Sequence, residues 1–408
     1  MNFLITNENN RNFKDFKFKS QLTKKYSIFS DNKLKIFKSK NQVIIVEGRI
    51  FGYYNRDKFI NLNQNKLGDY LNKKNLFKNL DGDYCIVKIS KDKIHFNIDN
   101  KGSYDLFYAN NKNSISFSNN FKLIKDLNHH NLTFDNFAIL NAISSVSKRP
   151  PLKSTIFNEI KRIDLDQEII LKNNQIKILS KKIKPKKIKE IISEKAFLEN
   201  YEKELREYSK VGTKKNKILF MSSGWDSLTI LKLLIDKFGK KSVKPVIAKL
   251  NFSKSSKIFN KYEIDKAKKI CAHFNIKLNI ITINYDKIFD YFDHLKKISS
   301  KRMLTNTFAY FLHYNLIRFG KRKFGDSDFY SGEISDGVHN FGFSQYVSLT
   351  DNENNGYREY ADKMMCYLFG PTFFKKVLNG SYLDDVIFKS LKNRLNIQTK
   401  KISQNKKK

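Results

Sequence analysis

The sequence has 408 residues, of which 40% are hydrophobic and 14% aromatic, and a formal net charge of +38. This length suits two domains rather than one core, and the apolar content excludes a globally disordered chain. The three cysteines, Cys85, Cys271 and Cys366, form no CxxC pair, which argues against a disulfide scaffold and against a zinc site built on thiolates.

The N-terminal residues 1–8 turn polar too soon for a signal peptide. No apolar run approaches the roughly 20 residues that a membrane-spanning helix needs. We therefore expect a cytoplasmic protein with no membrane association.

The first part of the chain, residues 1–185, reads as rich in β-strands. Short apolar or alternating runs separated by polar turn residues predict strands there. Asn173-Asn174 lies between the last two runs and predicts a hairpin turn. Short strands at regular spacing favour packed antiparallel sheets, which we expect to form an α+β domain. The runs are 42–50, 84–89, 93–98, 106–108, 115–118, 168–172 and 175–179.

The pattern changes after a basic stretch at 181–190, which we interpret as a linker. Apolar runs typical of buried parallel strands then alternate with segments of helical periodicity. This βαβαβ pattern predicts an α/β domain over residues 186–408, with an open, doubly wound parallel sheet. The predicted helices are 193–209, 227–238 and 262–274, and the predicted strands are 217–221, 246–250 and 278–283.

The segment with the clearest chemistry lies between the first of these strands and its helix, and reads Met221-Ser222-Ser223-Gly224-Trp225-Asp226-Ser227. Small residues let backbone N–H groups approach an anion, and a helix N-terminus adds unsatisfied donors. No Gly-Lys-Ser/Thr follows, so this is not a Walker A loop. Asp226 is placed to hold Mg²⁺ beside a phosphate. An ordinary turn with Asp226 as the helix N-cap is the alternative interpretation.

This segment resembles the PP-loop signature Ser-Gly-Gly-x-Asp-Ser of ATP pyrophosphatases, with Ser223 in place of the first Gly. Downstream, the run from Tyr330 to Gly337 resembles the Ser-Gly-Glu-Gly-x-Asp-Glu motif of the asparagine synthetase and β-lactam synthetase family. Ile334 and Gly337 depart from that motif. The resemblance implies that ATP phosphates contact Ser222, Ser223, Gly224, Asp226, Ser227, Ser331 and Gly332, that Asp226 and Asp336 hold Mg²⁺, and that Glu333 faces the reacting acyl group.

The first domain is similar to the Ntn-hydrolase-like glutamine amidotransferase domain of the same family, in the segments 81–84, 99–108 and 155–160. Glutamine-hydrolysing members carry a nucleophilic cysteine directly after the initiator Met, where this chain has Asn2. Glu47-Gly48-Arg49 stands where they have Asn-Gly-Glu. We expect Cys85, inside a predicted strand, to be a buried structural residue. The resemblance thus implies a domain that does not hydrolyse glutamine.

Together these features predict an ATP-dependent, amide-forming ligase with ATP and Mg²⁺ as cofactors. It would adenylate a small-molecule carboxylate and pass the acyl group to an amine or to ammonia. Two alternatives stay open: a non-catalytic relative with a binding or assembly role, and a PP-loop enzyme that modifies tRNA. The basic residues are spread along the chain, so the net charge alone does not lead us to expect a nucleic-acid partner. A homodimer is left open. Glu263 lies near the place of an acidic substrate-pocket residue of the family, but a surface residue of the predicted helix is the favoured interpretation.

Overall fold

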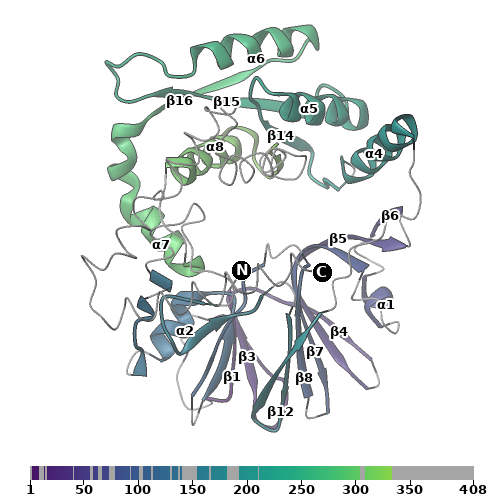
Figure 1. Cartoon of the computed structure of the whole chain (residues 1–408), viewed down its shortest axis with the longest axis vertical. Coiled ribbons are helices and arrows are strands. Elements are labelled where there is room, and N and C mark those ends of the chain that lie inside the picture. The colour runs from purple at the N-terminus through teal and green to yellow at the C-terminus, as the bar shows by residue number, and fades with distance from the viewer. Residues whose placement is uncertain are drawn as a thin grey trace, which may run out of the picture.

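The computed structural model describes residues 2–332, with gaps at 9–12, 14–15, 40, 56–57, 63–66, 73–78, 92, 101–103, 112–113, 129–130, 137, 140–153, 165–166, 182–192, 210 and 304–307. Two antiparallel sheets occupy one end of the molecule and a parallel sheet with its helices occupies the other (Figure 1). The protein is therefore a mixed fold that combines antiparallel sheets with a parallel sheet. No helix in the described part of the chain is both long and apolar enough to cross a membrane.

The first antiparallel sheet has six strands in the order β11-β9-β10-β1-β3-β2. Its inner face and the inner face of the second sheet form one core, in which Phe96 of β8 stacks on Phe117 of β10 with ring centroids 4.2 Å apart. On its outer face lies α2 (Phe121–Leu127), whose Phe121 and Ile124 are buried. The strands are β1 (Phe3–Thr6), β2 (Phe18–Gln21), β3 (Ser27–Ser30), β9 (Phe107–Asn110), β10 (Ile115–Ser118) and β11 (Ile160–Arg162).

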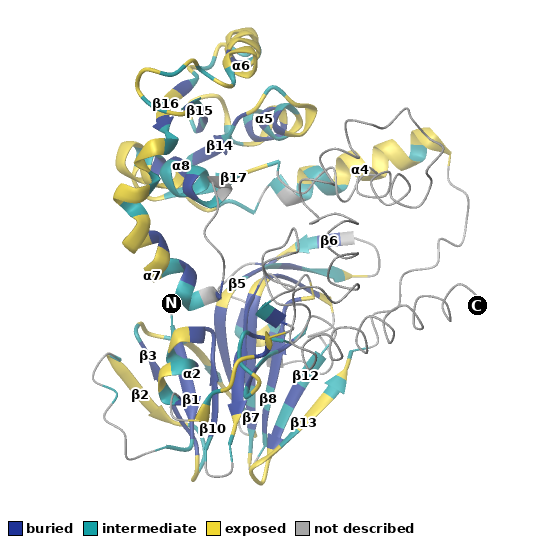
Figure 2. Ribbon diagram, turned by 60° about the vertical axis from the view of Figure 1, so that its left-hand side comes forward, coloured by how far each residue is buried: buried dark blue, intermediate teal, exposed yellow. Residues whose placement is uncertain are grey.

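The second antiparallel sheet has the order β13-β12-β8-β7-β5-β4, with β6 also paired to β5. Ile45 packs into the core between the sheets, while Ile44 and Val46 pack outward against α1 (Leu67–Asn72). The first part of β5 is thus buried on both faces, which explains its continuous apolar run (Figure 2). The strands are β4 (Lys35–Lys38), β5 (Val43–Asn55), β6 (Lys58–Asn61), β7 (Leu80–Ser90), β8 (Lys93–Ile98), β12 (Gln167–Lys172) and β13 (Gln175–Ser180).

The predicted hairpin is confirmed, because β12 and β13 pair in register and Asn173 and Asn174 have φ values of 52° and 61°. Two positive φ values suit the tight turn that joins such strands, and asparagine tolerates them better than most residues. The predicted linker, apart from Lys181, lies outside the described residues.

The parallel sheet has the order β16-β15-β14-β17. Successive residues of β14 face opposite sides: Leu219 packs against α5 and α6, and Ile218 packs against α8. The predicted βαβαβ succession is confirmed within a few residues at each end. The elements are β14 (Asn216–Phe220), α5 (Trp225–Phe238), β15 (Val243–Asn251), α6 (Lys261–His273), β16 (Asn279–Asn284), the 3₁₀ helix η4 (Tyr285–Tyr291), α7 (Phe292–Arg302), α8 (Phe308–Phe324) and β17 (Ser327–Tyr330).

Helices connect the two parts of the molecule. The predicted helix at 193–209 is present as α4 (Glu194–Ser209), which contacts β6 as well as α5. Helix α7 contacts α2, and Met303 at its end packs in the cluster with Phe121 of α2 (Figure 1). Through these helix contacts, the part that carries the parallel sheet is joined to both antiparallel sheets.

Candidate functional site

The two sequence motifs meet at one edge of the parallel sheet. Strand β17 pairs with β14 in parallel, with Leu219 opposite Tyr330, so the residues that follow both strands leave the sheet side by side. The chain proceeds from β14 to β15 and β16 on one side and returns to β17 on the other. In open α/β sheets, ligands bind at such a switch point, beyond the carboxyl ends of the strands.

The loop after β14 is held by hydrogen bonds between its own serines. The Ser227 hydroxyl accepts from the Ser222 backbone N–H at 3.2 Å and lies 2.9 Å from the Ser222 hydroxyl. It also lies 3.1 Å from the carbonyl oxygen of Gly224, to which it can donate. The Gly224 N–H donates to the Ser222 hydroxyl at 3.1 Å. Ser227 is 2% exposed, so it acts as an internal brace of the loop.

The alternative interpretation of Asp226 as the helix N-cap is wrong. Helix α5 begins at Trp225, its N-cap is Gly224, and Asp226 lies in the first turn. Because Gly224 has no side chain, it makes no side-chain hydrogen bond to the N–H groups of the first turn. A helix start of this kind leaves backbone donors for an anion.

The second motif packs directly on this helix start. A β-carbon placed on Gly332 would lie 2.9 Å from the β-carbon of Asp226 and 3.3 Å from the backbone nitrogen of Ser227. A β-carbon cannot come that close without a shift, so a glycine is required for this approach. Ser331, Gly332 and Asp226 are thereby brought together, as the resemblance implies.

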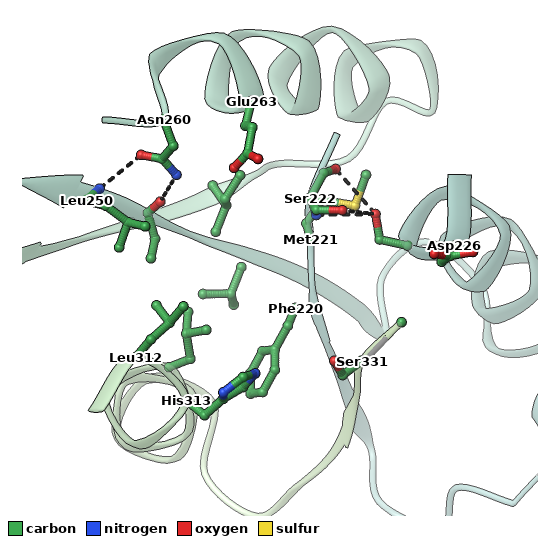
Figure 3. Close-up of a pocket in the computed structure, with 16 residues that line it drawn as sticks. Phe220, Met221, Ser222, Asp226, Leu250, Asn260, Glu263, Leu312, His313 and Ser331 are labelled. Carbon is green, nitrogen blue, oxygen red and sulfur yellow. Dashed lines mark hydrogen bonds between the residues drawn. The ribbon is translucent and has the colours of Figure 1, made fainter. Parts of the chain in front are cut away.

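A cavity of about 390 Å³ opens beside these residues (Figure 3). One end is polar and is formed by Ser222, Asp226, Ser227, Ser331 and Gly332. The other end is mainly apolar and follows β15 and α8. The volume falls in the range of small-molecule sites, which combine apolar walls with a few convergent polar groups. Its remaining lining residues are Phe220, Met221, Val246, Ile247, Ala248, Leu250, Asn260, Glu263, Leu312, His313 and Leu316.

Asn260 and His313 were not anticipated from the sequence. Asn260 precedes α6 and its side-chain amide bridges the edge of β15, accepting from the Leu250 N–H at 3.0 Å and donating to the Ala248 carbonyl at 2.8 Å. His313 of α8 lies with its ring centroid 6.0 Å from that of Phe220, and both line the cavity (Figure 3). An asparagine two residues before the start of a predicted helix was the available signal for Asn260, but α8 itself was not predicted.

The other candidates fall into three groups. Glu263 of α6 is exposed, as the favoured interpretation expects, and it also lines the cavity, so its role as a substrate-pocket residue stays a prediction (Figure 3). Ser223 and Gly224 belong to the loop but do not line this cavity. Glu333 and Asp336 lie outside the described residues, so their roles stay predictions.

Asp226 suits a Mg²⁺ ion that is shared with phosphate. Its carboxylate is exposed, at the polar end of the cavity. The described residues contain no group of three or more His, Cys, Asp or Glu side chains that could enclose a metal by themselves. Mg²⁺ typically takes one or two carboxylates and completes its shell with phosphate and water, so a single described carboxylate fits this ion.

In the antiparallel part, Asn2 takes part in hydrogen bonds that fix the start of the chain against Asp31. The backbone N–H and side-chain amide of Asn2 donate to the carboxylate oxygens of Asp31, each at 2.8 Å. Cys85 is fully buried in β7, and burial raises the pKa of its thiol well above the ordinary value. The interpretation of Cys85 as a buried residue is confirmed, and a thiol in this state is a poor nucleophile.

No protein-family model and no curated protein matches the sequence. Among solved structures, the chain is similar to an NH₃-dependent NAD synthetase from Campylobacter jejuni, at 17% identity and a TM-score of 0.21, covering 33% of this chain and 56% of that one. It is also similar to a glutamine-dependent NAD⁺ synthetase from Acinetobacter baumannii, at 14% identity and a TM-score of 0.26, covering 47% and 35%.

A third similar structure is the glutamine phosphoribosylpyrophosphate amidotransferase from B. subtilis, at 9% identity and a TM-score of 0.27, covering 63% of this chain and 76% of that one. The chain spans 56% of the length of the first synthetase and 35% of the second. At these identities and TM-scores the similarities assign neither a family nor an activity.

Proposed function

We propose that this protein is an ATP-dependent, amide-forming ligase of the asparagine synthetase-like kind, which activates a small-molecule carboxylate as its adenylate. The observation that carries the proposal is the packing of Gly332 against Asp226, which joins two separate motifs around one polar pocket end. An isolated Ser-Gly turn before a helix is common, whereas the meeting of two such segments from distant parts of the chain at a switch point supports an anion site.

In the proposed reaction, a carboxylate oxygen attacks the α-phosphorus of ATP. The bond from that phosphorus to the bridging oxygen of the β-phosphate breaks, and pyrophosphate leaves. The nitrogen of an amine or of ammonia then attacks the acyl carbon, AMP leaves with the electron pair of the C–O bond, and the nitrogen loses a proton. Glu333 is our candidate for the residue that serves this acyl transfer.

The described residues suit the first step. The backbone donors at the start of α5, with Ser222 of the loop after β14 and Ser331 after β17, would hold the phosphates. The loop after β14 needs little reorganisation, because Ser222 and Ser227 already brace one another. The apolar walls along β15 would take the adenine ring. Mg²⁺ bound to Asp226, and to Asp336 by the resemblance, would neutralise charge on the departing pyrophosphate.

The nitrogen donor in this proposal is a free amine or ammonia and not glutamine. Asn2 occupies the place of the nucleophilic cysteine and is bonded to Asp31. The antiparallel part therefore has a structural role in the proposal.

The test is a comparison of thermal stability between the wild type and Asp226→Asn, with and without Mg²⁺ and α,β-methylene-ATP, which cannot be cleaved at the proposed bond. A ligand at a hundred times its Kd adds about 2.7 kcal/mol to the free energy of unfolding. We expect a magnesium-dependent stabilisation in the wild type that is lost in Asp226→Asn. Asp265→Asn, on the exposed side of α6, is the control and should retain it.

A nucleotide shift of equal size in Asp226→Asn would refute the assigned metal and phosphate site. No shift in the wild type would favour the non-catalytic alternative. If the shift is present, pyrophosphate release in the presence of candidate carboxylates is the direct assay of the proposed reaction.

A further inference from the structure

A second cavity, of about 470 Å³, lies between the antiparallel part and the parallel sheet. Strand β5 contributes Arg49 and Phe51, β17 contributes the residues from Asp328 to Tyr330, and Ser331 follows β17. Helices α4 and α5 supply an apolar wall that includes Leu205 and Leu233. Ser331 lines both cavities, so the second cavity adjoins the candidate phosphate site but is lined otherwise by different residues.

Arg49 is the cation that faces this cavity. Its guanidinium donates to the Val211 carbonyl at 2.6 Å and to Asp328 Oδ1 at 3.5 Å. These bonds to described residues use two of the five N–H donors of an arginine. The side chain remains 40% exposed, so it is oriented by the protein and still accessible.

The negative charge of Asp328 is already shared with a second cation. Lys217 is 2% exposed, and its ammonium group lies 2.8 Å from Asp328 Oδ2. The same carboxylate oxygen accepts the backbone N–H of Lys214 at 2.7 Å. Two buried or half-buried cations thus face one carboxylate, which leaves an excess of one positive charge beside an apolar cavity.

We propose that this second cavity binds a small organic monocarboxylate whose carboxylate pairs with Arg49 and whose apolar body lies against Leu205 and Leu233. A guanidinium matches a carboxylate with two parallel hydrogen bonds, and the bond is strong where water is partly excluded. The volume is in the range of small-molecule sites. The inference goes beyond the proposed function, because it concerns a separate cavity and does not depend on nucleotide binding.

The test is isothermal titration of the full chain with 4-methylpentanoate and 3-phenylpropanoate, and with the matching neutral amides. We expect at least one acid to bind, and its amide to bind about tenfold or more weakly because the charge-assisted bond is lost. Arg49→Gln should weaken binding of the acid by a similar factor. Leu205→Trp narrows the cavity at a point away from the hydrogen bonds of Arg49, so it should also weaken binding of the acid. This second variant keeps the test informative if Arg49→Gln fails to fold.

Asp226→Asn should bind the acid as the wild type does, which separates this site from the nucleotide site. Binding of neither acid up to its solubility limit would overturn the proposal. Equal affinity for acid and amide, or unchanged affinity in both Arg49→Gln and Leu205→Trp, would also overturn it.

Discussion

Gly332 and Asp226, 106 positions apart in the sequence, approach so closely that a β-carbon on the glycine would come within 2.9 Å of the β-carbon of the aspartate. Replacing Gly332 with alanine must therefore displace the second motif or the start of α5. We expect Gly332→Ala to reduce the affinity for the ATP analogue by about tenfold or more, which corresponds to about 1.4 kcal/mol.

Gly224→Ala is the comparison for that variant, because it adds the same methyl group to the other segment of the proposed phosphate site. Its β-carbon would lie 3.4 Å from the Ser222 hydroxyl, an ordinary contact, so the loop has room for it. The loss of affinity for the ATP analogue in both variants is measured by the nucleotide-induced shift in melting temperature. A smaller loss in Gly332→Ala than in Gly224→Ala would contradict the close packing of the two motifs.

Ser227→Ala tests the brace inside the loop. The substitution removes the acceptor of the Ser222 N–H and the donor to the Gly224 carbonyl, which are two part-buried hydrogen bonds. We expect a loss of about 0.5–1.5 kcal/mol in the free energy of unfolding, measured by urea denaturation, and a weaker nucleotide shift. Thr229→Ala, at an exposed position of the same helix, should change neither quantity.

Asp328→Asn tests the charge cluster beneath the second cavity. Burial by itself raises the pKa of Asp328, but hydrogen bonds from Lys217 and the Lys214 N–H, with the charges of Lys217 and Arg49, hold it below the usual value. Removing the charge leaves the Lys217 ammonium buried without its counterion, which costs about 3–5 kcal/mol in the free energy of unfolding. Asp326→Asn removes only an exposed ion pair to Lys214 and should cost about 0–1 kcal/mol.

The difference in the free energy of unfolding between the wild type and Asp328→Asn depends on pH, and the lowered pKa of Asp328 determines the direction. Because the folded pKa of Asp328 is lowered, its carboxylate stabilises the protein fully above the unfolded value of about 3.9 and loses this contribution as the pH falls through the folded value. The difference between the wild type and Asp328→Asn should be constant from about pH 5 upward and shrink in more acidic solution. Denaturant titrations at several pH values measure it, and a difference that grows on acidification would contradict the assignment.

The buried thiols should resist alkylation in the folded protein. Burial raises the pKa of Cys271 to about 11 and raises that of Cys85 well above its ordinary value, so at pH 8 both thiols stay almost entirely protonated. In a Cys366→Ser background, iodoacetamide should label neither residue until denaturant is added. Rapid labelling of Cys85 in the folded state, detected by mass spectrometry, would reopen the question of a thiol nucleophile.

Local patterns predicted the succession from β14 to β16 because each strand is a buried apolar run and each helix has one apolar face. The same reasoning missed β17, whose four residues Ser327–Tyr330 are only half-buried and begin with Ser-Asp. It could not anticipate that Lys217 is buried, since lysine is rarely buried without a partner and its partner Asp328 lies 111 residues away.

For the candidate site, too, local sequence patterns predicted one part and missed the part that depends on tertiary packing. The loop from Ser222 to Ser227 could be interpreted from its small residues and its place between a strand and a helix. The cavity wall from α8 and the second cavity at Arg49 depend on how distant elements pack. Neither hydrophobic periodicity nor spacing along the chain contains that information.

The position of β17 beside β14 has a consequence for folding. Strands β14 to β16 and helices α5 and α6 are neighbours in sequence, so they can associate through short loop closures. Pairing of Asn216 with Ser327 instead closes a loop of more than a hundred residues, which costs more chain entropy and belongs late in folding. We therefore expect the loop after β14 to form before Ser331 and Gly332 dock beside it. Acquisition of nucleotide affinity would then be a kinetic marker for the final docking of β17.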